Sequence, residues 1–470
     1  MFVNRKPELS KLEELQQTGR AQLFVLYGRR RVGKTELLRE YCRGKRHIFF
    51  IATMQSDHDQ LAAFSQKVWG FMHEDILEGF TFPSWESAFR ALADLPDRAI
   101  VVLDEFTYLI SGNKAIPSIL QKVWDESLKS TGLILILCGS YVGLMERHVM
   151  GYQAPLYGRR TASLFLQPLD LPAAARFFPR YSPIQQIETW AVLGGMPYYL
   201  DAFDQSKGIF ANIRTHILDP KGRLHHEPRL VLMEELREPR NYFSILKAIA
   251  QGKTRLSEIA SGAGVGNASA TARYLDILQQ MHLIERKVPA TESRPEKSKK
   301  GIYQFTDQFL RFWFRYVQPH QGSLEMGLSS AVLTQRLRPT FNAFVGNAFE
   351  DASRRTIARL ARAGELPFLP ERIGGWWDRK GEIDVVAISE SERAVLLGEC
   401  KWTSRAVGVN IWHELRAKGD TIFSGAAFER KYYALFSKRG FTPAMRAEAK
   451  QHNVLLVTPD MIVKPASSAE

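Results

Sequence analysis

Cysteine and long apolar runs are both scarce in this sequence of 470 residues. The three cysteines, Cys42, Cys138 and Cys400, are far apart and form no C-x-x-C spacing, which disfavours a disulfide framework and a structural zinc site. The longest aliphatic runs, such as residues 133–137, stop far short of the roughly 18 residues that span a bilayer, and no stretch resembles a secretory signal. We therefore expect a cytoplasmic protein with no membrane as partner.

Internal repeats are also absent, and the composition is that of an ordinary folded protein, with 45% hydrophobic and 24% charged residues. At roughly 150 residues per domain, the length indicates about three domains. The 63 lysines and arginines exceed the 50 aspartates and glutamates, which gives a net charge of +13. This excess favours a polyanionic partner, namely a nucleotide, a nucleic acid or an anionic surface.

The N-terminal third alternates apolar runs with amphipathic stretches. Residues 23–27, 99–103 and 133–137 have the length and the branched-chain content of buried strands, and residues 35–42 continue as a helix after a Gly-rich turn. This order predicts an α/β core over residues 1–170, with a parallel sheet and crossover helices.

A phosphate-binding motif follows the first predicted strand. It reads Gly28-Arg29-Arg30-Arg31-Val32-Gly33-Lys34-Thr35, which satisfies G-x-x-x-x-G-K-[ST] between a strand and a helix. The glycines let backbone N–H groups turn toward phosphates, Lys34 reaches the β and γ oxygens, and Thr35 is placed to ligate Mg²⁺. The motif predicts ATP and Mg²⁺ as cofactors of a P-loop NTPase sheet. The alternative is a Gly-rich turn with no ligand.

Polar residues follow the second and third predicted strands. Asp104 is suited to hold magnesium through water, and Glu105 to orient or deprotonate the attacking water. Ser140 is the natural polar sensor between that water and the γ-phosphate. The alternatives are a solvated strand end for the two acids and a helix N-cap for Ser140.

Two arginines precede the strand-like residues 163–166. Arg159 or Arg160 could answer transition-state charge on a phosphoryl group, either in cis or from a neighbouring subunit of a homo-oligomer. A salt-bridged surface pair is the alternative.

The rest of the chain changes pattern three times. Residues 171–236 are helical and broken by Gly194-Gly195-Met196-Pro197, which suggests a helical lid. Residues 237–306 show three short helices and then a hairpin, the outline of a winged helix-turn-helix. Residues 307–330 form an aromatic connector, and residues 331–470 form the last domain. The hairpin tip contains four basic residues, Arg294, Lys297, Lys299 and Lys300.

The last domain contains a second constellation of charged residues. Residues 382–388 and 394–402 read as two strands of a hairpin, so Glu399 and Lys401 share one face and Asp384 can meet them across the hairpin. Two carboxylates that bind Mg²⁺ and a lysine that activates water suit metal-assisted phosphodiester cleavage. Glu350, in a predicted helix over residues 341–360, could add an oxygen ligand. An ordinary charged hairpin is the alternative.

Polar residues of the middle of the chain suggest a surface for nucleic acid. The outer side of the third short helix is predicted to present Asn267, Ser269, Thr271 and Arg273, which together with the basic hairpin tip would suit a DNA major groove. A solvated face used in protein contacts is the alternative. His225 and His226 lack partners at metal-ligand spacing, so we expect both at the surface.

Several motifs together resemble a known family. Phe2-Val3-Asn4-Arg5, with Glu8 and Leu12, and residues 27–35 resemble the opening of the archaeal-type ATPases, within the signal-transduction ATPases related to AAA+ proteins. Residues 103–106, 138–140, 156–160 and 194–200 resemble the later motifs of that family. The resemblance implies that Lys34 and Thr35 bind ATP, and that Asp104 and Glu105 bind magnesium and activate water.

The last domain is similar to the domain of unknown function that often closes these chains, which has the look of a PD-(D/E)xK nuclease fold. Asp384, Glu399 and Lys401 fall on that motif, while Ile383 stands where the pattern usually has proline. The expected architecture is therefore a P-loop NTPase sheet with a helical lid, then a winged helix-turn-helix, then an α/β restriction-endonuclease-like domain.

Three functional hypotheses follow. The first is an ATP-hydrolysing switch whose winged helix and nuclease-like domain engage double-stranded DNA. The second keeps ATP but makes the C-terminal parts modules that bind protein partners without catalysis. The third makes the ATPase regulatory and the nuclease the main enzyme.

Overall fold

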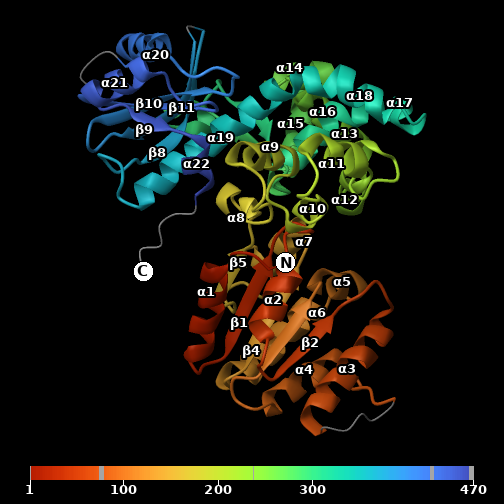
Figure 1. Cartoon of the computed structure of the whole chain (residues 1–470). Helices are drawn as coiled ribbons and strands as arrows, with labels where there is room; N and C mark the ends of the chain where they lie inside the picture. Colours follow the sequence, from red (N-terminus) through yellow and green to blue (C-terminus); the bar gives the residue numbers. More distant parts are fainter. Residues whose placement is uncertain (1, 74–78, 237, 380, 424–427, 465–470) are drawn as a thin grey trace. The chain divides into compact units, whose positions relative to one another are not determined.

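The computed structural model describes residues 2–73, 79–236, 238–379, 381–423 and 428–464. The chain divides into two compact units, one formed by residues 1–168 and 196–198 and the other by residues 169–195 and 199–470. Each unit is built on one five-stranded sheet (Figure 1).

All strands of the first sheet run parallel, in the spatial order β2-β3-β4-β1-β5. They are β1 (Gln22–Tyr27), β2 (His47–Ile51), β3 (Ile100–Asp104), β4 (Ile134–Gly139) and β5 (Ala162–Phe165). The inner strands are buried almost throughout, which explains their continuous apolar sequences. The strands predicted at residues 23–27, 99–103 and 133–137 are confirmed, and so is the parallel α/β core. The edge strand β2 was not predicted.

Seven α-helices of the described residues accompany the first sheet: α1 (Lys6–Gln17), α2 (Lys34–Cys42), α3 (Asp57–His73), α4 (Trp85–Arg90), α5 (Phe106–Gly112), α6 (Ile116–Glu126) and α7 (Val142–Met145). Alternate residues of β1, β3 and β4 pack with α3 to α6 in one hydrophobic cluster. This packing leaves the carboxyl ends of the strands to position polar side chains.

The second unit begins with short helices, as the periodicity of residues 171–236 predicts. They are α8 (Leu171–Ala175), α9 (Pro183–Leu193), α11 (Ile209–Ile213) and α12 (Glu227–Glu235), while α10 (Pro197–Leu200) begins in the first unit and ends in the second. The aromatic segment after the hairpin forms α16 (Gln308–Tyr316), followed by α17 (Gln321–Glu325) and α18 (Ser329–Val332).

Between these groups lies a helix–hairpin module, which we define as residues 239–305. It consists of α13 (Pro239–Ala250), α14 (Leu256–Ala263), α15 (Ala268–Gln280) and the antiparallel strands β6 (Ile284–Lys287) and β7 (Ile302–Phe305). The three predicted helices and the predicted hairpin are therefore confirmed, while the assignment as a winged helix-turn-helix stays a prediction.

The C-terminal sheet is mixed, in the order β12-β11-β10-β9-β8. Its strands are β8 (Arg372–Trp377), β9 (Glu382–Ser389), β10 (Ala394–Lys401), β11 (Arg430–Ser437) and β12 (Leu455–Val457). Strand β9 is antiparallel to both of its neighbours, β8 and β10, whereas β10, β11 and β12 run parallel. The helices α19 (Phe341–Arg362), α20 (Val409–Ile422), α21 (Pro443–His452) and α22 (Pro459–Val463) accompany this sheet.

The tip of the module hairpin is fastened to the edge strand β8. The backbone N–H of Ala290 donates to the carbonyl of Gly375 at 2.9 Å, and Ala290 itself is part of the hydrophobic core of the C-terminal sheet. The indole Nε1 of Trp377 donates to the Lys300 carbonyl at 3.2 Å. These contacts cover a sheet edge that would otherwise expose unpaired backbone groups.

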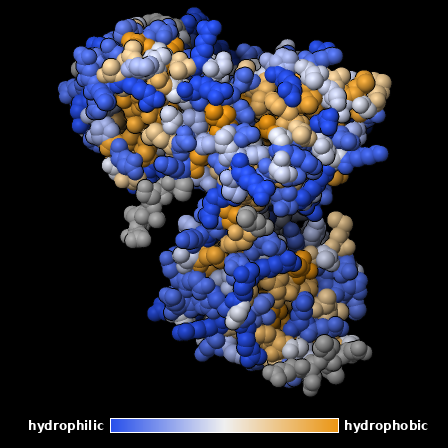
Figure 2. Space-filling model, viewed as in Figure 1, coloured by the Kyte–Doolittle hydropathy of each residue, from blue (hydrophilic) through white to orange (hydrophobic). Residues whose placement is uncertain are grey.

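Figure 2 shows hydrophilic side chains over much of the visible surface, with smaller hydrophobic patches between them. In the part of the chain that the structure describes, none of the helices has both the length and the apolar sequence needed to cross a membrane.

Candidate functional site

The phosphate loop, residues 28–35, leaves the carboxyl end of β1 and enters α2. Its backbone has positive φ at Gly28 (155°), Arg31 (72°) and Gly33 (95°). A Cβ on Gly28 would lie 2.7 Å from the carbonyl oxygen of Leu166, so only glycine fits there. The loop thus has the strand-to-helix context in which backbone N–H groups of a helix N-terminus bind phosphate.

Lys34 is held inside the loop. It is 5% exposed, and its Nζ donates to the carbonyls of Gly28 at 2.8 Å and Arg29 at 3.1 Å. The loop therefore holds the ammonium group beside its own backbone, where a bound polyphosphate would meet it.

Thr35 and Asp104 meet at the mouth of the loop. The Thr35 hydroxyl donates to Asp104 Oδ2 at 2.7 Å, and Asp104 Oδ1 accepts from the backbone N–H of Glu105 at 2.9 Å. Asp104 is only 1% exposed, which excludes the solvated strand end. A hydroxyl and a carboxylate oxygen at one point are donors that fit Mg²⁺.

Glu105 and Ser140 form the next pair. Glu105 has a left-handed backbone (φ 53°, ψ 41°), and its Oε1 accepts a hydrogen bond from the Ser140 hydroxyl at 2.7 Å. Its other oxygen, Oε2, is buried and has no hydrogen-bond partner among the described residues. Ser140 does not act as the N-cap of α7, a position taken by Tyr141. The structure brings Glu105 and Ser140 together because they follow the neighbouring strands β3 and β4.

The two arginines before β5 lie away from the phosphate loop. They precede the amino end of β5, whereas the loop follows the carboxyl end of the parallel strand β1, so the two lie at opposite edges of the sheet. Arg159 pairs with Asp125 at 3.0 Å, and Arg160 donates to the Met150 carbonyl at 3.0 Å. The ion pair matches the alternative of a surface salt bridge for Arg159. A role in trans stays a prediction.

Arg5 is a residue of this site that pattern reasoning missed. It is 7% exposed, and its Nη2 donates to the carbonyls of Val32 at 3.2 Å and Gln167 at 2.8 Å, while Nη1 pairs with Glu8 at 3.0 Å. It therefore ties the phosphate loop to the segment that leaves β5. Only the family resemblance points to Arg5, because a single arginine far upstream of the loop forms no pattern.

Tyr198 is a second missed neighbour of the loop. The guanidinium carbon of Arg31 lies 4.0 Å from the centre of the Tyr198 ring, and both residues belong to the first unit. Pro197 Cγ lies 3.7 Å from the position that a Cβ on Gly33 would take. The segment 196–198 thus contacts the phosphate loop although it is remote in sequence.

In the C-terminal sheet, Asp384 and Glu399 lie at adjacent ends of β9 and β10. Asp384 Oδ2 accepts from the backbone N–H of Cys400 at 2.7 Å. Glu399 is 9% exposed, and its two oxygens accept from Lys401 Nζ at 2.7 Å and Lys418 Nζ at 3.3 Å. The burial of Glu399 argues against an ordinary solvated hairpin. Lys418, on α20, was not predicted.

The proximity of these groups shifts their pKa values. Burial, together with the nearby carboxylates of Glu350 and Glu399, raises the pKa of Asp384 to about 7. Burial also raises the pKa of Glu350, against the opposing effect of Arg354, whose Nη2 lies 3.0 Å from Glu350 Oε2. Although burial lowers it, the hydrogen bond to Glu399 gives a net increase in the pKa of Lys401.

The metal prediction for this cluster receives no geometric support. The carboxylate oxygens suit a hard cation, but the described residues contain no group of three His, Cys, Asp or Glu side chains that could hold a metal ion. We therefore derive no reaction step through a metal in the C-terminal sheet.

Two predictions about surface residues are wrong. Thr271 is fully buried rather than outward, because its hydroxyl bonds within its own turn to the carbonyl of Asn267 at 3.1 Å. His225 is 1% exposed rather than at the surface, and its Nδ1 lies 2.8 Å from the Ile217 carbonyl oxygen. His226 is exposed, as expected. Both buried residues escape a hydropathy argument because a local carbonyl satisfies each polar group.

The other residues of the predicted nucleic-acid surface are exposed, but Asn267 and Lys300 already interact with neighbouring groups. Ser269 and Arg273 are exposed, whereas Asn267 caps α15 by accepting from the backbone N–H of Ala270. At the hairpin tip Lys300 pairs with Glu292 at 2.9 Å. Arg294, Lys297 and Lys299 are exposed.

Two family models and several known proteins match this chain. A family model described as "ATPase domain predominantly from Archaea" matches residues 2–203, and one described as "Archaea bacterial proteins of unknown function" matches residues 313–411. An uncharacterized protein of Methanocaldococcus jannaschii is 32% identical over 442 residues, which cover 93% of this chain and 96% of that protein. An uncharacterized ATP-binding protein of the same organism is 52% identical over 46 residues, or 10% of this chain and 78% of that protein.

Similar solved structures include the Walker-type ATPase of Pyrococcus abyssi, with a TM-score of 0.48 and 23% identity, covering 67% of this chain and 96% of that chain. The ORC2 protein of Aeropyrum pernix, in ADPNP and ADP complexes, has a TM-score of 0.42 and 14% identity, covering 69% and 95% of the two chains. The predicted family is confirmed, while the winged helix and the nuclease-like fold stay predictions. The chain belongs to the archaeal-type ATPase family shared with the long Methanocaldococcus jannaschii relative, with an ATPase domain at its N-terminal end and a domain of unknown function toward its C-terminal end.

Proposed function

We propose that the protein is an ATP-binding and ATP-hydrolysing switch whose second unit engages DNA. The observation that carries the ATPase part is the joined pair of contacts at the phosphate loop, Thr35 with Asp104 and Ser140 with Glu105. Asp104 and Glu105 at the end of β3 thus meet Thr35 at the start of α2 and Ser140 after β4, an arrangement that suits one pair for Mg²⁺ and the other for orienting water.

Each side chain has a distinct task in this proposal. Lys34 balances the charge of the β- and γ-phosphates, and Thr35 with Asp104 holds Mg²⁺. Bound Mg²⁺ supplies the charge neutralisation that phosphoryl transfer requires. Glu105 would orient the attacking water through Oε2, because the Ser140 hydroxyl donates only to Oε1 and no group of the described residues donates to Oε2. Arg159 or Arg160 would act from a neighbouring subunit, which makes a homo-oligomer part of the proposal.

Paired variants test the ATPase. Lys34→Ala is expected to abolish turnover and strongly weaken ATP binding in calorimetry, because the loop loses its internal cation. Glu105→Gln is expected to keep ATP affinity but to slow turnover roughly 100-fold or more, because only water activation is lost. Lys11→Ala and Glu14→Gln change the same residue types on the exposed ion pair of α1, so both should behave like the parent. Unchanged ATP affinity in Lys34→Ala would refute the proposed site.

For the second unit, we propose that the helix–hairpin module is a winged helix-turn-helix that binds duplex DNA. The exposed Ser269 and Arg273 on α15, together with the basic hairpin tip, support this proposal. Stimulation of ATP turnover by duplex DNA is the expected result. No stimulation, together with no binding of duplex or single-stranded DNA, would favour the alternative in which the C-terminal parts bind protein partners.

That alternative has one observation of its own. Both oxygens of Glu399 are engaged by lysines, as in a purely structural ion-pair cluster. We nevertheless propose the nuclease-like assignment for Asp384, Glu399 and Lys401, with Glu350 beside them. DNA cleavage that is lost in Asp384→Ala is expected. Cleavage that survives the substitution would place the activity elsewhere.

A further inference from the structure

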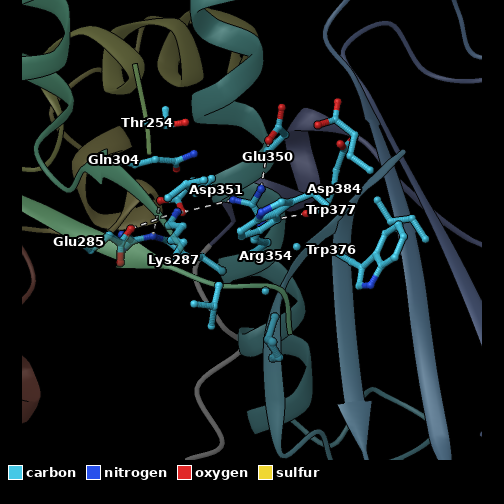
Figure 3. A pocket seen from close by; sticks show the side chains of 18 of the residues that line it. Thr254, Glu285, Lys287, Gln304, Glu350, Asp351, Arg354, Trp376, Trp377 and Asp384 are labelled. Carbon is cyan, nitrogen blue, oxygen red and sulfur yellow. Dashed lines mark hydrogen bonds and ion pairs between the residues drawn. The ribbon is translucent and has the colours of Figure 1, made fainter. Parts of the chain in front are cut away.

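A cavity of about 610 Å³ lies within the second unit, between the helix–hairpin module and the C-terminal sheet (Figure 3). Thr254 and Gln304 line it from the module, Glu350 from α19, and Trp377 and Asp384 from β8 and β9. Polar and charged side chains from separate parts of the sequence thus enclose one space. The cavity includes the carboxylates Glu350 and Asp384, and the hairpin strands β6 and β7 form another of its walls.

We propose that this cavity binds one or two unpaired nucleotides of single-stranded DNA. The inference rests on the proposed engagement of DNA by the second unit and specifies the form of DNA that this cavity accepts. Its volume falls within the roughly 300–1,000 Å³ of sites for small molecules of nucleotide size. A sphere of 610 Å³ is about 10 Å across, less than the roughly 12 Å width of a major groove alone, so an intact duplex does not fit.

The hairpin wall keeps the cavity narrow. Lys287 of β6 forms an ion pair with Asp351 of α19 at 3.2 Å, which Figure 3 shows crossing from the hairpin to the helix. On the other side the backbone bond from Ala290 to Gly375 joins the hairpin to β8. Admission of a duplex would require both connections to break, whereas an unpaired strand can enter with them intact.

Trp377 offers a surface on which a base can stack. The ring is half-buried in the cavity wall, and the hydrogen bond from its Nε1 to the Lys300 carbonyl restrains its orientation. An aromatic side chain restrained before binding loses little entropy when a base stacks on it. Stacking of this kind is tolerant of base identity and is common in sites for single strands.

The cavity also offers cations for the backbone of the strand. Arg355 lines the cavity with a side chain that is 60% exposed, and it shares Asp351 with Lys287 and Arg354. A phosphate can therefore pair with Arg355 while Lys287, at 3.2 Å, still balances Asp351. Arg255, exposed and on the same cavity, adds a second cation. Cations beside an aromatic surface are the combination that tracks a single strand.

The test is fluorescence anisotropy with the full-length protein in EDTA, so that binding is measured without cleavage. The probe is a fluorescein-labelled DNA strand of about 12 nucleotides, alone or annealed to its complement. Trp377→Leu is expected to weaken single-strand binding roughly 5- to 100-fold, whereas Trp377→Phe, which keeps a ring, should stay within about 3-fold of the parent. Trp69→Leu, the same change on α3 of the first unit, is the matched control and should have no effect.

A second pair of variants tests the cations. Arg355→Gln should reduce the slope of log affinity against log salt by roughly 0.7, the contribution of one phosphate on a single strand. Arg362→Gln, which removes an exposed arginine from the same helix, should leave that slope unchanged. Circular dichroism and ATP turnover of each variant verify that the chain is folded.

The outcomes separate this inference from the proposed function. Parental affinity for the single strand in Trp377→Leu would overturn the inference, while DNA engagement by the second unit would stand. A loss of duplex affinity in Trp377→Leu equal to its loss of single-strand affinity would also overturn it. Absence of binding by either form of DNA would instead refute the proposed DNA engagement, and this inference with it.

Discussion

At the scale of single residues, the acid Asp384 links function to stability. Its pKa of about 7 lies above the ordinary value of 3.8, so the folded state favours the neutral form. The folded chain therefore holds a proton that the unfolded chain releases between pH 4 and 7. The stability associated with this group is fully present below about pH 4 and is lost as pH rises through about 7.

We predict that Asp384→Asn relieves this loss. The amide oxygen can still accept from the Cys400 N–H, while the buried charge beside Glu350 and Glu399 disappears. In EDTA, the free energy of unfolding of the variant relative to that of the parent should increase by on the order of 1–3 kcal/mol from pH 5 to pH 8. This range allows for partial solvent screening. Calorimetric melting of the second unit at both pH values measures the gain.

Asp378→Asn is the control for that experiment, because Asp378 is exposed in the same domain. The melting temperature of Asp378→Asn should equal that of the parent at pH 5 and at pH 8. An equal difference between Asp384→Asn and the parent at pH 5 and pH 8 would show that Asp384 does not titrate in this range.

Residue identities at the nucleotide site could be predicted where the chemistry is contiguous in sequence. Lys34 and Thr35 lie in one motif, and Asp104 follows a buried strand, so both patterns are local. Arg5 and Lys418 act across long sequence separations, on Val32 and on Glu399. No local periodicity encodes such contacts, because folding alone brings the partners together.

At the scale of elements, the hairpin tip provides a prediction about duplex binding. Arg294, Lys297 and Lys299 are exposed, whereas Lys300 pairs with Glu292 and is less available to phosphate. Replacing the three exposed residues by glutamine should reduce the slope of log affinity for duplex DNA against log salt by roughly two to three. Anisotropy titrations at several salt concentrations measure the slope.

The matched control removes three exposed basic residues from the C-terminal domain, namely Arg362, Arg405 and Lys450. Both triple variants lower the net charge equally, so a general effect of charge would change both slopes. A tip variant with the slope of the parent would assign the tip to solubility or to protein contacts.

Helices and strands were predicted well where apolar spacing is regular, and the orientation of single polar residues was predicted less well. The helix over residues 268–280 follows from Leu275 and Leu278, which are both fully buried. Thr271 was assigned to the wrong face because polarity was equated with exposure. A short hydroxyl that bonds to its own helix turn can be buried at little cost.

At the scale of the whole molecule, the chain passes between its two units at residues 168–169, 195–196 and 198–199. The segment 196–198 belongs to the ATPase unit and contacts the phosphate loop, while its flanking residues belong to the second unit. Any change of the loop on nucleotide binding therefore reaches residues that are directly bonded to the second unit. A segment of this kind can bias an equilibrium between two states only if its contacts differ between them.

We predict that the contact between Arg31 and Tyr198 differs between the nucleotide-free and the nucleotide-bound states. Phosphates bound in the loop should draw the Arg31 guanidinium toward their charge and away from the Tyr198 ring, 4.0 Å from it in this structure. Hydrogen exchange of residues 194–203 should then change on addition of a non-hydrolysable ATP analogue. Tyr198→Ala should remove about half or more of that change while ATP still binds. Tyr152→Ala, which truncates a tyrosine that is 84% exposed, should preserve the full change. Equal exchange with and without the analogue in the parent would show that the segment does not report the nucleotide state.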